Sequence, residues 1–131
     1  MEKYLSVHSL PSNSLVEKAN IRFDFGDMIL EYDYFLADKY WYSYIRFHSV
    51  RAMKFTAELH CNENQLDAES QIIEIVNSNW SRKLLLNENE DTLNHWILNH
   101  YMIYLDDNGC FEFLANSWET YTPKLGRLNN N

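Results

Sequence analysis

The sequence predicts a mostly β, α+β protein: an antiparallel sheet of six to eight strands with one or two helices. A β-sandwich or an open barrel is the alternative arrangement. Several stretches alternate apolar and polar residues, as half-buried strands do. Aromatic residues, which favour strands, make up 15% of the chain. Helical stretches do not alternate with the strands, which argues against a parallel sheet. The length of 131 residues predicts a single domain over residues 1–131.

Strands are predicted throughout the first half of the chain. Their ranges are 3–10, 20–25, 28–35, 40–47 and 50–59. The first range alternates poorly, whereas 20–25 alternates cleanly between apolar and charged residues. In the last range four residues are expected to face inward: Met53, Phe55, Ala57 and Leu59.

A turn at Gly26-Asp27 is predicted between the strands at 20–25 and 28–35. Glycine would occupy the first central position of a two-residue turn, where it is favoured. This turn puts three apolar pairs on one face and one opposite-charge pair on the other. The pairs are Phe25 with Met28, Phe23 with Leu30, Ile21 with Tyr32, and Arg22 with Glu31.

The middle of the chain is less regular. Residues 66–77 fit a helix or a buried strand, and their β-branched residues favour a strand at 70–76. Ser78 is a predicted N-cap for a helix over 79–86, which the acidic run at 87–91 ends. Beyond about residue 123 the chain is expected to be frayed.

The hairpin over residues 95–118 is the most apolar stretch, and its register decides which side chains meet. A two-residue Asn108-Gly109 loop would mix polar and apolar residues on both faces. A three-residue loop with Gly109 as a left-handed bulge pairs Asp106 with Cys110 and makes one face wholly apolar. Because burial of one face selects such a register, we predict the bulged loop. The other face then gathers His100, Tyr104, Glu112 and Asn116 around a Met102–Leu114 pair.

Composition narrows the range of functions. The formal charge of −8 disfavours binding to nucleic acid or anionic membrane and suits a soluble protein or capture of a basic partner. No apolar run is long enough to cross a bilayer, and no signal peptide is recognisable. Two cysteines are too few for a disulfide scaffold. A cytoplasmic protein with reduced thiols is expected.

Motifs of catalysis and metal binding are absent from the sequence. It has no glycine-rich phosphate loop, no G-x-S-x-G elbow, and neither C-x-x-C nor H-E-x-x-H. We therefore predict no catalytic residue, no metal site and no cofactor, and we do not expect an enzyme.

Three groups of residues are candidate binding sites. On the polar face of the hairpin, His100 and Glu112 form either an acid–base pair in a pocket or an ordinary cross-strand pair. The face with Tyr40, Tyr42 and Tyr44 is either a recognition surface or a product of strand propensity. Two acidic groups are either solvated loops or contacts for a basic partner. They comprise Glu63, Asp67 and Glu69, then Glu88, Glu90 and Asp91.

A family resemblance is carried by residues 70–118. Its pieces are Ile72-Ile73-Glu74-Ile75-Val76, Asn77-Ser78-Asn79-Trp80, and the run from His100-Tyr101 through Asp106-Asp107 to Gly109-Cys110 and Glu112. These resemble small acidic bacterial proteins, among them immunity proteins of toxin–immunity pairs. The resemblance implies a cytoplasmic protein that binds a protein partner, and it assigns no functional residue.

Two functional hypotheses follow from these observations. The first is a non-enzymatic binding protein, an immunity protein that neutralises a basic toxin. The alternative is a small-molecule-binding protein or enzyme with a pocket around His100, Tyr104 and Glu112. The sequence leaves the oligomeric state open.

Overall fold

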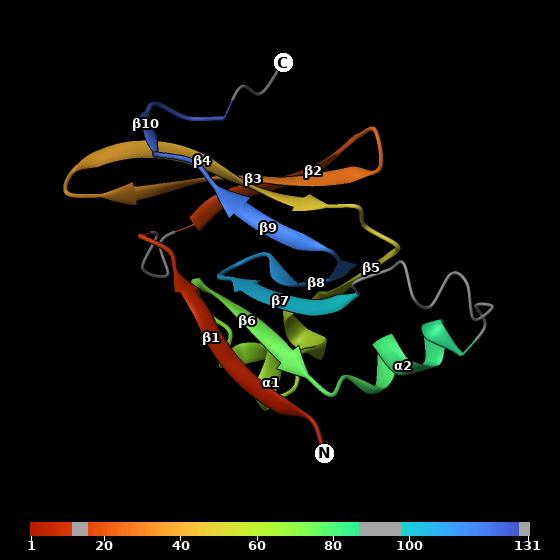
Figure 1. Cartoon of the computed structure of the whole chain (residues 1–131). Coiled ribbons are helices and arrows are strands. Elements are labelled where there is room, and N and C mark those ends of the chain that lie inside the picture. The colour runs from red at the N-terminus through yellow and green to blue at the C-terminus, as the bar shows by residue number, and fades with distance from the viewer. Residues whose placement is uncertain (12–15, 87–97, 129–131) are drawn as a thin grey trace.

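The computed structural model describes residues 1–11, 16–86 and 98–128, and its strands form two antiparallel five-stranded sheets (Figure 1). Sheet A has the order β1 (Lys3–Ser9), β6 (Gln71–Val76), β7 (Asn99–Leu105), β8 (Gly109–Ala115) and β5 (Ala52–Ala57). Sheet B has the order β10 (Lys124–Leu125), β4 (Lys39–His48), β3 (Asp27–Leu36) and β2 (Val16–Asp24), and β9 (Ser117–Thr120) also pairs with β4. The mostly β, α+β class is confirmed, although the described residues form ten strands rather than six to eight.

In the ranges that the structure describes, three short helical segments connect or cover the strands. They are the 3-10 helix η1 (Glu58–His60), α1 (Glu63–Leu66) and α2 (Asn79–Leu85). The N-cap prediction is confirmed, because the Ser78 hydroxyl oxygen accepts the Ser81 N–H at 3.1 Å. The predicted strand at 70–76 is confirmed as β6. In the described part of the chain, no helix is long and apolar enough to span a bilayer.

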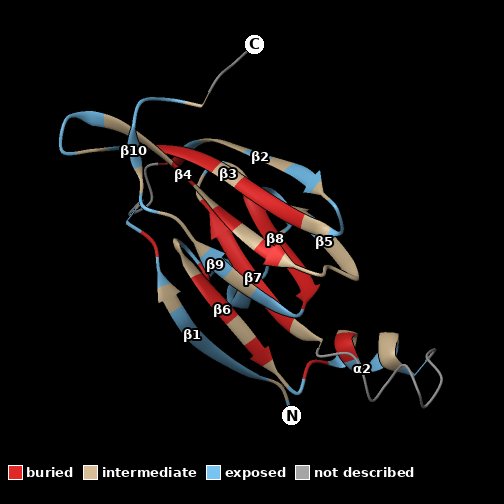
Figure 2. Cartoon of the chain, turned by 45° about the horizontal axis from the view of Figure 1, so that its top comes forward, coloured by how far each residue is buried: buried red, intermediate tan, exposed pale blue. Residues whose placement is uncertain are grey.

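The main core lies between the two sheets. Their inner faces bury alternate residues of the central strands, coloured red in Figure 2. Leu30 and Tyr32 of sheet B belong to the same cluster as Ile103 of sheet A. Phe47 of β4 stacks on Phe113 of β8 with ring centroids 4.0 Å apart, so this face of β4 belongs to the core.

A second, smaller cluster lies on the outer face of sheet A. Ile75, Met102 and Cys110 belong to it, together with Ala68 from the segment after α1. Figure 1 shows α1 beside this outer face. Because sheet A is covered on both faces, polar residues on its outer face can be buried, and β7 and β8 are buried along almost their whole length.

The register of the β7–β8 hairpin differs from the prediction by two residues. Leu105 pairs with Gly109, and Met102 pairs with Glu112, so the predicted pairing of Asp106 with Cys110 is wrong. The loop has positive φ at two residues, Asp107 at 62° and Gly109 at 141°. Because side chains alternate with a period of two, a two-residue shift leaves every side chain on its predicted face.

The β2–β3 hairpin shows the same two-residue shift. Its turn uses Phe25 and Gly26, both with positive φ, so the predicted Gly26-Asp27 turn is wrong. Turns of this kind need two left-handed residues. Arg46 binds both residues that flank this turn, Asp24 and Asp27, at 2.8 Å each, which favours the observed position.

One of the four inward-facing predictions for residues 50–59 is wrong. Leu59 is 94% exposed, because the strand ends at Ala57 and η1 follows it. Phe55 does lie on the inner face, opposite Phe111 of the core, but it is 50% exposed because β5 is an edge strand. The segment after about residue 123, which is expected to be frayed, makes contacts with sheet B over residues 124–128. Here β10 pairs with β4, and the Leu128 N–H binds Asp33.

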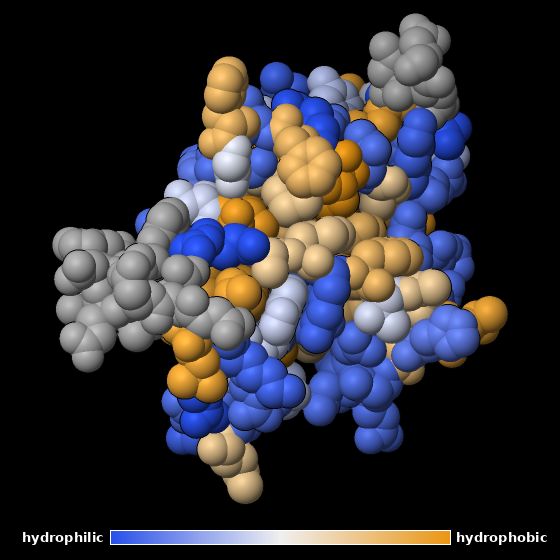
Figure 3. All heavy atoms as spheres, turned by 90° about the vertical axis from the view of Figure 1, so that its right-hand side faces the viewer, coloured by the Kyte–Doolittle hydropathy of each residue, from blue (hydrophilic) through white to orange (hydrophobic). Residues whose placement is uncertain are grey.

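Apolar side chains also gather on the side of the molecule that Figure 3 shows, where the β2–β3 turn and β5 lie. Among the exposed large apolar residues are Phe23 and Phe25 in that hairpin and Phe55 in β5. Both β2 and β5 are edge strands of their sheets.

Candidate functional site

The candidate site is built on a buried pair on the outer face of sheet A. His100 of β7 and Glu112 of β8 are each 4% exposed, and His100 Nε2 lies 2.8 Å from Glu112 Oε1. The shifted register makes the two residues diagonal neighbours, since His100 pairs directly with Leu114. The predicted meeting of His100 and Glu112 on one face therefore occurs.

The other ring nitrogen of His100 is bound to the start of α2. His100 Nδ1 lies 2.7 Å from the Ser78 hydroxyl oxygen, which also accepts the Ser81 N–H. An ionised carboxylate only accepts, so Nε2 carries the proton toward Glu112. With a neutral ring, the Ser78 hydroxyl then donates to Nδ1, and every polar atom in this chain of hydrogen bonds has a partner.

Glu112 is held ionised although it is buried. Burial acts to raise the pKa of its carboxyl group, but the hydrogen bond from His100 and the charge of Lys54 outweigh burial and hold the pKa below its ordinary value. Its second oxygen, Oε2, accepts from Gln65 Nε2 at 3.2 Å and lies 3.9 Å from Lys54 Nζ. A fixed negative charge therefore lies at the outer face of the sheet.

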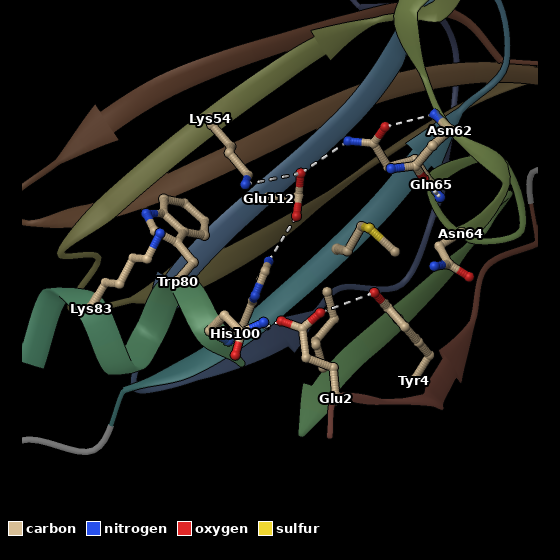
Figure 4. A pocket seen from close by; sticks show the side chains of 13 residues that line it. Glu2, Tyr4, Lys54, Asn62, Asn64, Gln65, Trp80, Lys83, His100 and Glu112 are labelled. Atoms are coloured by element: carbon tan, nitrogen blue, oxygen red, sulfur yellow. Dashed lines mark hydrogen bonds and ion pairs between the residues drawn. The ribbon is translucent and has the colours of Figure 1, made fainter. Parts of the chain in front are cut away.

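A pocket of about 400 Å³ opens over this pair (Figure 4). Trp80 of α2 stands beside it, edge-on to His100 with ring centroids 5.1 Å apart. Lys54 Nζ lies 4.5 Å from the centroid of the Trp80 ring. Most lining side chains are polar, and four separate segments supply the walls. They are Glu2 and Tyr4 near the N-terminus, Lys54 in β5, Asn62, Asn64 and Gln65 around α1, and Trp80 and Lys83 in α2.

The Ser78–His100–Glu112 chain contains the residue types of a nucleophile triad, but its surroundings do not suit acyl transfer. Ser78 is only 4% exposed, and its oxygen caps α2. Nearby backbone donors are already engaged, because the Asn79 N–H binds Glu2 and the Ser81 N–H binds Ser78. An oxyanion hole needs such donors free. The arrangement instead fixes the positions of His100 and Glu112.

Two of the four residues predicted on this face lie away from the pocket. The Tyr104 hydroxyl is buried beneath η1 and donates to Glu58 Oε1 at 2.9 Å. Asn116 is exposed beyond the end of β8, where its carbonyl oxygen accepts from Asn99. Neither residue lines the pocket. The two-residue shift in register explains why Asn116 lies away from the pocket, because Leu114 pairs with His100 in its place.

The tyrosine face of β4 is largely engaged within the chain. Tyr44 stacks on Tyr121 at 4.2 Å, and the Arg127 guanidinium lies 4.3 Å from the Tyr40 ring centroid. Tyr42 pairs with Lys124 of β10. The C-terminal segment therefore contacts the face that the sequence suggested for recognition.

The acidic groups provide no pocket wall in the described residues. Glu63, Asp67 and Glu69 are exposed around α1, whereas Glu88, Glu90 and Asp91 lie outside the described residues. A different group of carboxylates, Glu58, Asp106 and Asp107, has ligand atoms within 4.8 Å of one another and could hold a cation. Burial, followed by the charges of Asp107 and Glu69, raises the pKa of Asp106, so that carboxyl group ionises less readily.

Sequence reasoning missed most of the pocket walls. The candidate binding residues that the sequence indicates include neither Lys54 nor Trp80. Gln65 is positioned by a reciprocal capping box with Asn62, which the sequence pattern Asn-x-x-Gln could have indicated. No local pattern indicates that these segments meet.

Fold and site together define a two-sheet antiparallel β protein with a polar pocket on the outer face of one sheet. Comparisons with protein-family models, curated proteins and solved structures find no match to this chain.

Proposed function

We propose that the protein is a non-enzymatic binding protein and that the pocket over His100 and Glu112 is its binding site. The carrying observation is the way Glu112 is held: buried, ionised, and fixed by His100 and Gln65 beneath an open pocket. Both ring nitrogens of His100 have partners within the chain, so neither is free to act on a ligand as acid or base. A fixed charge in a site that has no free proton donor or acceptor is suited to binding a partner.

The partner that fits this chain is a basic protein. A net charge of −8 attracts basic partners and speeds their association. Small-molecule pockets are usually lined mostly by apolar side chains, whereas this lining is mostly polar, which suits a hydrophilic side chain of a larger partner. Within this proposal, the resemblance to immunity proteins makes the partner a bacterial toxin met in the cytoplasm.

Pocket size favours a second candidate, a small polar ligand. A volume of about 400 Å³ falls within the usual range for small-molecule sites. The two candidates share one site. They differ in whether a protein partner or a small polar molecule occupies it.

The test is co-expression with a basic toxin encoded next to the gene, with cell growth as the measurement. The wild-type chain restores growth and forms a complex with the toxin. Glu112→Gln, which removes the fixed charge but keeps the shape of the side chain and one acceptor oxygen, weakens the complex about tenfold or more. Asp67→Asn is the matched control, because it makes the same charge change at an exposed residue outside the lining. Equal complexes for the two variants would refute the proposed site.

A further inference from the structure

We propose that the pocket receives an arginine side chain of the protein partner, in the place between Trp80 and Glu112 that Lys54 now occupies. This inference rests on the proposed function and names the group that the site recognises.

The side chains of the cation site are positioned by residues other than Lys54. Glu112 is positioned by His100 at 2.8 Å and by Gln65 at 3.2 Å. Trp80 is positioned by its edge-on contact with the same histidine. A fixed carboxylate beside an aromatic face is the arrangement that attracts a desolvated cation. Figure 4 shows these side chains around one cavity.

Lys54 shows that the site accepts a cation and also that it holds this one loosely. Its ammonium lies over the Trp80 ring, but it stays 3.9 Å from Glu112 Oε2, well beyond a charge-assisted hydrogen bond. The Lys54 side chain is 49% exposed and comes from an edge strand, so it can turn into solvent without disturbing the sheet.

Charge balance in the lining allows one cation to be exchanged for another. Among the described residues, the lysines and glutamates that line the pocket are Lys54, Lys83, Glu2 and Glu112. Glu2 is held on the wall by the Asn79 N–H at 2.9 Å. When Lys54 leaves, one carboxylate is left without a matching positive charge. One incoming cation restores the balance of charge, whereas a second cation would have no carboxylate to match it.

Arginine fits this site better than lysine does. A planar guanidinium can stack flat on the Trp80 ring while its N–H groups donate in the plane to a carboxylate, whereas the three N–H groups of an ammonium leave it no flat face to stack. The amide side chains of Asn62 and Asn64 line the same pocket and offer further acceptors. The compact ammonium of Lys54 leaves that side of the pocket open.

The experiment titrates N-acetyl-arginine methylamide into the whole chain and follows the Trp80 indole N–H signal by NMR. We expect a saturable shift of that signal. The neutral citrulline analogue is the matched probe and produces no saturable shift, because it retains the shape but not the charge. Lys54→Met removes the internal competitor, keeps an unbranched side chain, and strengthens arginine binding about threefold.

Specific outcomes overturn the inference. They are no saturable shift with either the wild type or Lys54→Met, an equal shift with the citrulline analogue, or weaker arginine binding by Lys54→Met. The citrulline comparison needs no variant, so a folding defect cannot obscure it. If the toxin complex depends on Glu112 but the arginine probe does not bind, the proposed function stands and this inference fails. If the probe binds but Glu112→Gln leaves the toxin complex unchanged, the pocket binds arginine without being the toxin-binding site, and the proposed function fails together with the part of this inference that rests on it.

Discussion

At the scale of single residues, the pocket depends on a carboxylate that stays charged where burial opposes charge. Glu112 keeps its charge because His100 and Gln65 donate to it and Lys54 lies near it. Such a group stabilises the protein only while its partners are in place, since an unpaired buried charge is costly. Binding chemistry and stability are therefore linked at this residue.

We predict that Glu112 makes the stability of the protein depend on acid pH. Its pKa is lower in the folded protein than the ordinary value of 4.5. Its ionised form therefore stabilises the fold above about pH 4.5, and this contribution is lost as the pH falls through the folded-state pKa. Glu112→Gln cannot titrate. The difference in unfolding free energy between the wild type and this variant should therefore shrink on acidification. Urea unfolding between pH 7 and pH 3 measures it, and a pH-independent difference would contradict the prediction.

At the scale of elements, the sequence predicts strands and their faces more reliably than it predicts register. Both hairpins are shifted by two residues from the predicted pairing, yet their side chains keep the predicted faces because strands alternate with a period of two. The register is decided by the turn, and the alternation of side chains along the strands gives no information about the turn. Phe25 is left-handed in the β2–β3 turn, and Arg46 from the neighbouring strand binds both sides of it. Local turn preferences could not show that contribution.

Gly109 supplies a prediction at this scale. A Cβ atom added there would lie 2.4 Å from the Thr56 carbonyl oxygen and 2.8 Å from the Phe55 ring, at a φ of +141°. Gly109→Ala should therefore force β5 away from β8 and lower the unfolding free energy by about 3 kcal/mol or more. Thermal and urea unfolding measure this loss.

Gly26→Ala is the control for this prediction. Gly26 also has positive φ, at +86°, but nothing lies within 4 Å of an added Cβ atom. Only backbone strain remains, and the expected loss is about 1 kcal/mol. Equal losses of unfolding free energy in the two variants would show that the close approach of β5 to Gly109 contributes nothing to the effect.

At the scale of the whole molecule, each sheet has an outer face that distant segments cover. Sheet A is covered by the N-terminal residues, the η1–α1 segment and α2, and these supply the walls of the pocket. Local patterns predicted the floor of the site, His100 and Glu112, because both lie in one hairpin. They could not predict Lys54, Gln65 and Trp80, which tertiary packing brings together from three separate segments.

The outer face of sheet B is covered by the C-terminal segment of the chain, and Asp33 connects the sheet to this segment. Asp33 is 1% exposed and accepts two backbone N–H groups, from Lys18 at 2.9 Å and Leu128 at 3.0 Å. The ion pair of Arg127 with Glu17 is half-exposed and contributes little by comparison. We therefore expect the buried carboxylate to hold this segment against the sheet.

Asp33→Ala should release the C-terminal segment, because two N–H groups lose their buried acceptor, at a cost of about 2 kcal/mol. Trypsin cleavage after Lys124 and Arg127, followed by mass spectrometry, measures the release. Cleavage after Lys54 in sheet A serves as the reference for global unfolding. We expect the C-terminal sites to be cut about tenfold faster or more, relative to that reference. Glu17→Gln removes only the exposed ion pair and should change the ratio little. If both variants are cut at the same relative rate, Asp33 does not hold the segment, and the tyrosine face of β4 is covered by some other contact.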